Sequence, residues 1–160
     1  MNKIILALSM FLFSSSLWAN ESIQQDQPSM IPLKEYIKNK NIQNDDGAKG
    51  YMALRCGCLY LVTSVMMEGK NEDKNKKEND ILCKNYSIQG NLLWKMARKI
   101  MAVKMNNMTK NIENITMFYI EDSNKNYQRT GNMMVDSYMG DDLIICKEFV
   151  EKNSKYLNEK

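Results

Sequence analysis

The sequence of 160 residues contains no histidine, and this absence excludes several kinds of site. Without histidine there is no Ser-His-Asp or Cys-His arrangement for nucleophilic catalysis and no histidine-based zinc or blue-copper site. Haem attachment through Cys-x-x-Cys-His is excluded as well, and no glycine-rich phosphate loop is present. The chemistry left to the chain is that of carboxylates, cysteines and methionines.

Proline and excess charge are also scarce. The chain has 2 prolines, Pro28 and Pro32, and the long remainder has none. Because a proline inside a helix costs about 3 kcal/mol, this remainder favours a helical domain. The formal net charge is only +3 at pH 7, which does not indicate binding to nucleic acid.

The N-terminus has the layout of a secretory signal peptide. Lys3 precedes an apolar run over residues 4–13, and small residues lead to Ala19, after which we expect cleavage. The run is short for a membrane span, so we expect no stable membrane insertion after cleavage. The abundance of Lys, Asn and Ile is typical of an AT-rich genome. The signal peptide predicts a periplasmic or secreted protein, and the composition favours a bacterial periplasm.

The chain after the signal peptide divides into an arm and a helical domain. We predict a signal peptide at 1–19, an irregular arm at 20–49 with a helical turn near 33–37, and a helical domain at 50–160. Asp80 or Ser87 is a plausible N-cap, Gly140 is expected to end one helix, and Asp141 or Asp142 to start the last. The helices are expected at 50–68, from 80 or 87 to 108, at 110–121, 127–139 and 143–157, with an interruption around "DSNKN".

The helix expected at 50–68 is apolar nearly all round. Its only charged residues are Arg55 and Glu68. Such a helix is usually buried by several neighbours, and a membrane span with Arg55 and Gly57 inside it is the less favoured alternative. The predicted fold is all-α: a disulfide-stapled bundle of four to five helices with an irregular N-terminal arm and this helix at its centre.

Four cysteines, Cys56, Cys58, Cys83 and Cys146, predict disulfides in an exported protein. Side chains two apart on a helix point about 200° away from each other, so Cys56 and Cys58 cannot bridge each other. We expect each to pair with Cys83 or Cys146, and the spacing leaves the combination open. A simple antiparallel hairpin would place Cys83 too near the end of the first helix, so we expect either the charged loop at 68–80 or the segment "DILCKNYS" to fold back.

The cysteines and methionines also allow redox and metal-binding interpretations. A redox pair at Cys56 and Cys58 is disfavoured by its apolar flanks, and a four-cysteine metal site by export. Met101, Met105 and Met108 share one helix face, as thioether ligands of Cu(I) would, although methionine commonly fills gaps in a core. We assign no metal and no cofactor.

Carboxylates are the remaining basis for catalysis, as in a hydrolase of cell-wall glycans. Nothing in their spacing marks a pair of acids, so we assign no catalytic residue. The available acids near apolar segments are Glu68, Glu121, Asp122, Asp136, Asp141 and Asp142.

A signal peptide is followed by a cysteine-bearing helix and then by a cysteine that opens a second helix. This layout resembles small periplasmic immunity proteins that neutralise type VI secretion effectors, and the resemblance covers Cys56 to Met108. This resemblance implies a protein partner. We predict an exported non-enzymatic domain that binds a protein as an inhibitor, immunity or accessory protein. The alternatives are a carboxylate-dependent glycan hydrolase and a thiol or thioether protein for redox chemistry or Cu(I). A partner surface is first sought among the tyrosines and methionines of residues 126–140, which otherwise pack in the core.

Overall fold

The computed structural model describes residues 30–38, 40–42, 44–68, 76–101 and 105–158. Every regular element in these residues is a helix, which confirms the all-α prediction. The predicted signal peptide and the first part of the arm lie outside the described residues. The helices are α2 (Leu33–Lys38), α3 (Asp46–Glu68), α4 (Lys76–Met101), α5 (Met105–Thr130), α6 (Tyr138–Lys152) and α7 (Ser154–Asn158).

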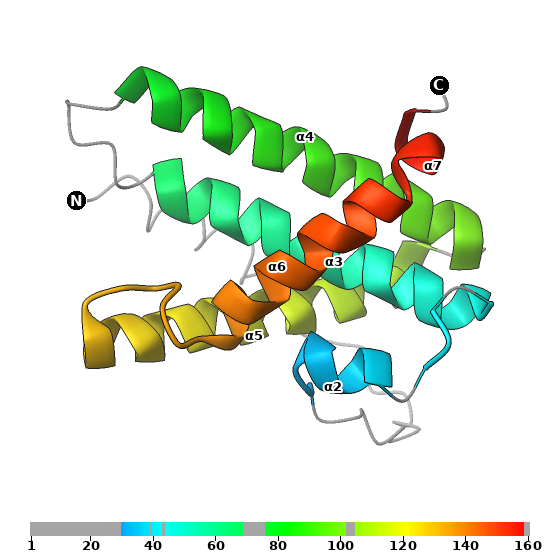
Figure 1. Cartoon of the computed structure of the whole chain (residues 1–160), viewed down its shortest axis with the longest axis horizontal. Helices are drawn as coiled ribbons and strands as arrows, with labels where there is room; N and C mark the ends of the chain where they lie inside the picture. The colour runs from blue at the N-terminus through cyan, green and yellow to red at the C-terminus, as the bar shows by residue number, and fades with distance from the viewer. Residues whose placement is uncertain (1–29, 39, 43, 69–75, 102–104, 159–160) are drawn as a thin grey trace, which may run out of the picture.

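Helix α3 is the centre of the fold (Figure 1). α4 runs beside it, α6 crosses over it, and α5 also packs against it. Of its 23 residues, 14 are buried, from Ala48 to Ser64, so its all-round apolar character is explained by neighbours on several sides. By length and composition α3 could cross a membrane, but 72% of its most apolar stretch is buried inside the domain.

A pair of glycines allows α3 and α4 to approach closely. A Cβ atom built on Gly57 would lie 2.4 Å from Cδ1 of Trp94 and 3.1 Å from the carbonyl oxygen of Gly90. A Cβ atom on Gly90 would lie 3.0 Å from the carbonyl oxygen of Gly57. Farther along the same pair of helices, Ser64 Oγ donates a hydrogen bond to the carbonyl oxygen of Cys83 at 2.9 Å. α3 and α4 are therefore antiparallel neighbours, and the predicted fold-back of "DILCKNYS" is wrong because this segment continues α4. The other predicted place for a fold-back, the charged loop, lies largely outside the described residues.

The N-terminal end of the described chain is more regular than expected. The predicted turn at 33–37 is confirmed as α2, and α3 begins at Asp46, before residue 50. Asp45 starts α3, because its Oδ1 accepts a hydrogen bond from the backbone N–H of Ala48 at 2.9 Å. Leu33 is fully buried in the core, so α2 belongs to the packed helices.

The predicted interruption at "DSNKN" is wrong, because α5 continues through it to Thr130. Its polar side chains have partners: Ser123 Oγ donates to the carbonyl oxygen of Ile120, and the Asn126 amide donates to the carbonyl oxygens of Asn132 and Val135. The chain leaves α5 at Gly131, whose φ of 72° favours glycine. Residues 131–137 then form a turn rather than the predicted helix.

α6 also begins earlier in the sequence than predicted, at Tyr138. Its N-cap is Ser137, whose side-chain oxygen accepts a hydrogen bond from the backbone N–H of Gly140, and not Asp141 or Asp142. Gly140 lies inside the first turn rather than at the end of a helix. A Cβ atom there would lie 2.1 Å from the carbonyl oxygen of Met134, so glycine is needed for close approach of the preceding turn.

Candidate functional site

A buried ion pair joins α3 to α6. Nη2 of Arg55 lies 2.7 Å from Oδ2 of Asp142, and both side chains are 0% exposed. Tyr119 of α5 completes the group, because its hydroxyl accepts a hydrogen bond from Nε of Arg55 at 2.9 Å and donates one to Oδ2 of Asp142 at 2.7 Å. Leu33 N donates to Oδ1 of Asp142 at 2.9 Å, and Arg55 Nη1 donates to the carbonyl oxygen of Ile31.

These contacts determine the protonation of the cluster. Burial raises the pKa of the Tyr119 hydroxyl well above its usual range, so Tyr119 remains a hydrogen-bond donor. Burial lowers the pKa of Arg55, but Tyr119 and Asp142 outweigh that effect and the pKa is raised overall, which keeps the guanidinium charged. Burial raises the pKa of Asp142, and the positive charge of Arg55 opposes the rise.

The cluster is closed to solvent, and its polar atoms bind one another or the backbone. Its geometry therefore suits a structural role: it holds the segment around Ile31 and helices α2, α3, α5 and α6 together. The sequence contained a signal for it, because a single arginine in an apolar helix needs a buried acceptor. Asp142 was missed because an aspartate after a glycine is also typical of a helix start.

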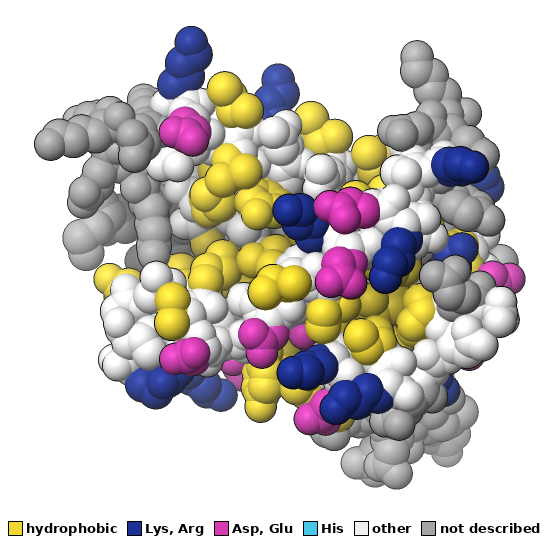
Figure 2. All heavy atoms as spheres, in the orientation of Figure 1, with side chains coloured by type: hydrophobic (Ala, Val, Ile, Leu, Met, Phe, Trp, Pro, Cys, Tyr) yellow, Lys and Arg dark blue, Asp and Glu magenta, His cyan; other side chains and the backbone are white. Residues whose placement is uncertain are grey.

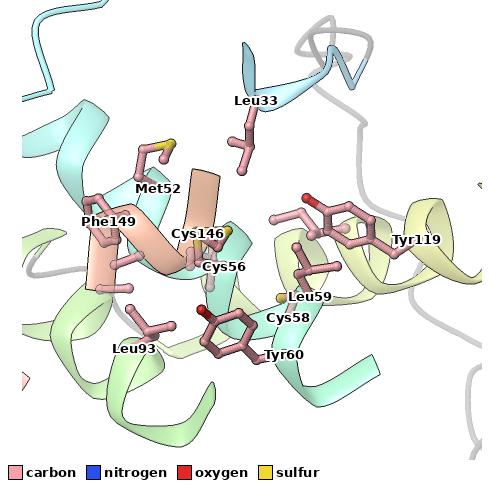
Figure 3. Packing of buried hydrophobic residues seen from close by; sticks show 14 of the residues in the cluster. Leu33, Met52, Cys56, Cys58, Leu59, Tyr60, Leu93, Tyr119, Cys146 and Phe149 are labelled. Carbon is pink, nitrogen blue, oxygen red and sulfur yellow. A yellow bond between two sulfur atoms is a disulfide. The ribbon is translucent and has the colours of Figure 1, made fainter. Parts of the chain in front are cut away.

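A disulfide lies next to this cluster and joins the same two helices. Cys56 and Cys146 are bridged, with Cα atoms 5.4 Å apart, in one of the pairings that the sequence left open. Figure 3 shows the bond inside the core, among side chains that include Met52 and Leu59. Disulfides persist in oxidising compartments, so this bond indicates a non-cytoplasmic environment.

The second predicted disulfide is absent, because Cys58 and Cys83 are free and buried. In the α3–α4 hairpin Cys83 lies opposite Ser64, and Cys58 lies near the Gly57–Gly90 contact. Six residues of helix separate Cys58 from Ser64, a rise of about 9 Å, whereas bridged Cα atoms lie within about 7 Å. The extended hairpin keeps the two thiols too far apart to bridge.

The surroundings of the two free thiols disfavour the thiolate form. Burial raises the pKa of Cys58 to about 11, against opposing contacts with Trp94 and Thr116. Burial and the carboxylates of Glu68 and Asp80 raise the pKa of Cys83. A reactive thiol needs a stabilised thiolate, so neither environment is that of a redox centre.

Two of the three methionines considered as thioether ligands of Cu(I), Met101 and Met108, have packing roles in the described residues. Met108 is 3% exposed in the core, and Met101 fills the space beside Gly50 of α3. The side chain of Met105 lies outside the described part of the structure. Met101 and Met108 therefore pack the core, as methionine often does.

Of the six candidate acids, three lie apart from one another and three share one hollow. Glu68 is exposed at the end of α3, Glu121 lies 3.9 Å from Lys125, and Asp142 is in the buried ion pair. Asp122 accepts a hydrogen bond from the backbone N–H of Met139 at 3.0 Å, at the start of α6. Only Asp122, Asp136 and Asp141 line one hollow together, with Lys125, Arg129 and other polar side chains.

An apolar groove lies between α4 and α6, above α3, and we call it the α4–α6 groove. Its floor includes Tyr60, whose ring packs edge-on against that of Tyr86 with centroids 5.3 Å apart. Burial raises the pKa of Tyr60 to about 12. Figure 2 shows hydrophobic side chains exposed between these two helices. The hollow has a volume of about 480 Å³ and is lined by Tyr60, Leu82, Asn85, Tyr86, Gln89, Leu143, Ile144, Lys147, Val150 and Glu151.

Two of the lining residues leave large apolar surfaces in water. Ile144 is 64% exposed and Leu82 is 39% exposed. The sequence did not single out this groove, because its residues come from three helices whose packing angle is not visible in the periodicity. Of the segment 126–140, Met133 and Met134 line a hollow next to the groove, which also includes Leu82, Tyr86 and Leu143.

Fold and site together define a class of protein: in its described residues it is a small all-helical domain organised around an apolar helix, with the Cys56–Cys146 disulfide and the buried Arg55–Asp142 ion pair. Comparison with models of protein families, with curated proteins and with solved structures finds no match to this chain.

Proposed function

We propose that this protein is an exported helical domain of a bacterial periplasm that acts without catalysis, by binding a protein partner in the α4–α6 groove. The observation that carries the proposal is the exposure of Ile144 and Leu82 beside the packed rings of Tyr60 and Tyr86. Contiguous apolar surface with a polar rim is typical of a protein interaction site.

The chemistry of the groove favours an amphipathic helix of the partner as its occupant. Two helices form its walls and a third its floor, which is the shape into which an apolar helix face packs. The polar rim holds the amides of Asn85 and Gln89 together with one cation, Lys147, and one anion, Glu151. A partner helix would place apolar residues at helical spacing over Ile144 and polar residues at this rim.

The export part of the proposal is supported by the Cys56–Cys146 disulfide and by the predicted signal peptide. A rigid core suits a binding domain, because a surface that is already ordered loses less conformational entropy when it binds. The disulfide and the buried ion pair both hold α6, which forms one wall of the groove.

The experiment is site-specific photo-crosslinking in the exporting cell, followed by affinity measurement. A photo-reactive side chain at Ile144 is expected to capture one protein, whereas one at Ile88 is not, since Ile88 is 48% exposed on α4 and does not line the groove. The purified partner should then bind the Ile144→Asp variant at least about tenfold more weakly, and the Ile88→Asp variant normally. Equal crosslinking from the two positions, or equal affinity of the two variants, would contradict the proposal.

A further inference from the structure

Four methionines meet in a hollow that adjoins the α4–α6 groove. Met66 and Met67 lie near the end of α3, and Met133 and Met134 lie in the turn between α5 and α6. The hollow has a volume of about 310 Å³, and Thr63, Asn132 and Tyr86 contribute to its lining. Two segments far apart in the sequence thus contribute two methionines each to the lining of one hollow.

These methionines differ in exposure from those of the core. Met52, Met96, Met108 and Met139 are between 0% and 5% exposed, as expected for side chains that fill gaps. The methionines of the hollow are all partly exposed and border open space. Met66 and Met134 pack against the core on one side and border the hollow on the other, so these side chains are only partly used in packing.

The turn that carries two of them is held in place by hydrogen bonds. The backbone N–H of Met134 donates to Oδ1 of Asn132 at 2.9 Å, and its carbonyl oxygen accepts from Oγ of Ser137 at 3.0 Å. Gly140 packs so closely under Met134 that no Cβ atom would fit. The backbone of this turn is thus set before any ligand arrives, which lowers the entropy cost of binding.

The lining of the hollow selects for a particular kind of ligand. It contains no carboxylate, no amine and no guanidinium, so hard cations such as Mg²⁺ or Ca²⁺ find only the neutral oxygen atoms of Thr63, Tyr86 and Asn132 and lack a charge-neutralising ligand. Thioether sulfur is a soft, uncharged donor that suits Cu(I). We propose that the hollow formed by Met66, Met67, Met133 and Met134 is a binding site for a soft monovalent cation, Cu(I), with thioether ligands.

The test uses Ag(I) as a redox-stable probe of the same softness, titrated into the purified mature protein by calorimetry. The protein carries Cys83→Ser, so that the thiol nearer the surface supplies no ligand. About one equivalent should bind to this protein, and the fourfold change of Met66, Met67, Met133 and Met134 to Leu should weaken binding at least about tenfold. The pair Met133→Leu and Met134→Leu alone should weaken it measurably, and serves if the fourfold variant fails to fold.

The matched control is the pair Met96→Leu and Met108→Leu, which changes two buried core methionines and should leave Ag(I) binding unchanged. Cu(I) held by a chromophoric chelator should be withdrawn by the parent protein and not by the fourfold variant. The proposal is overturned if the parent binds no Ag(I), if the Leu variants of the hollow bind as well as the parent, or if the core variant loses binding equally. None of these results bears on partner binding at Ile144, so the two proposals succeed or fail separately.

Discussion

At the scale of single residues, Arg55 has the strongest constraint in the molecule. It lies in the middle of the central helix, is 0% exposed, and has Asp142, Tyr119 and the carbonyl oxygen of Ile31 as hydrogen-bond acceptors. Moving a charge into a protein interior is costly, and the cost is recovered only if the partners are all in place. The main effect of the cluster is therefore to fix the position of α6 on α3, and its net contribution to the free energy of unfolding is small.

Removal of the carboxylate is expected to be severe. The Asp142→Asn variant leaves the buried guanidinium without its counter-charge, and we expect a loss of about 3 to 5 kcal/mol in the free energy of unfolding. Urea unfolding followed by circular dichroism measures it. The control is Glu148→Gln, which breaks an exposed pair with Lys152 at 3.7 Å and should cost less than about 1 kcal/mol. Similar costs for the two variants would contradict the structural role of Asp142.

The buried thiol of Cys58 predicts a pH dependence of stability. Burial raises the pKa of Cys58 from 9.0 to about 11 in the folded state. A raised pKa means that the folded state retains the proton longer, so its contribution is complete below pH 9 and is lost as the pH rises toward 11. From pH 8 to pH 11 the wild-type protein should lose about 2 to 3 kcal/mol more than Cys58→Ala does.

Unfolding midpoints in urea at several pH values, measured for both proteins, give this difference directly. The Cys83→Ser variant is the comparison for a thiol close to the surface, since Cys83 is 7% exposed and Cys58 is 0% exposed. If the wild-type and Cys58→Ala proteins lose stability in parallel above pH 9, Cys58 does not titrate as its burial implies.

At the scale of helices, the contact between Gly57 and Gly90 determines how closely α3 and α4 pack. We expect Gly57→Ala to destabilise the protein by about 1 to 3 kcal/mol, although alanine is the better helix former, because its Cβ atom collides with Trp94 and with backbone. Thermal unfolding measures the change. In the control Gly47→Ala the nearest atom is Oδ1 of the exposed Asp45, at 3.2 Å, and the change should stay within about 1 kcal/mol. A Gly57→Ala variant as stable as wild type would show that the helices can separate without cost.

The positions of some helices could be predicted from the sequence, whereas the boundaries of others could not. The central position of α3 was predictable, because a helix that is apolar on all sides needs neighbours on all sides. The continuity of α5 could not be predicted, because Ser123 and Asn126 favour turns unless the fold supplies hydrogen-bond partners for them. The start of α6 was misplaced for a similar reason. Gly140 and Asp142 serve packing and the ion pair rather than the helix ends that their residue types suggested.

The candidate sites were less predictable than the fold. Both the α4–α6 groove and the methionine hollow combine residues of α3, α4 and the region around α6, and no local pattern reports how three helices meet. The cysteine pattern correctly excluded a bond between Cys56 and Cys58 but left the partners open. The register of α3 against α4 places Cys83 too far from Cys58 for a disulfide, and this register is not visible in the sequence.

At the scale of the whole molecule, the disulfide closes a loop across most of the domain. Cys56 and Cys146 are 90 residues apart in the sequence. Replacing both by serine should lower the free energy of unfolding by about 4 to 5 kcal/mol, because the unfolded chain is then no longer constrained. A reducing agent should cost the wild-type protein a similar amount and the double variant nothing. The outcome that contradicts this is an unfolding curve of wild type that reduction leaves unchanged.

The positions of the bonds to α6 have a consequence for the order in which the chain becomes structured. Arg55 and Cys56 are made early in synthesis, whereas their partners Asp142 and Cys146 come close to the C-terminal end of the sequence. A growing chain that stops before Asp142 has a central helix with an unneutralised charge and an unpaired thiol at positions meant for the core. The packing around the middle of α3 is therefore complete only when α6 has been synthesised. Until α6 is present, Arg55 and Cys56 therefore lack the partners that they have in the folded domain.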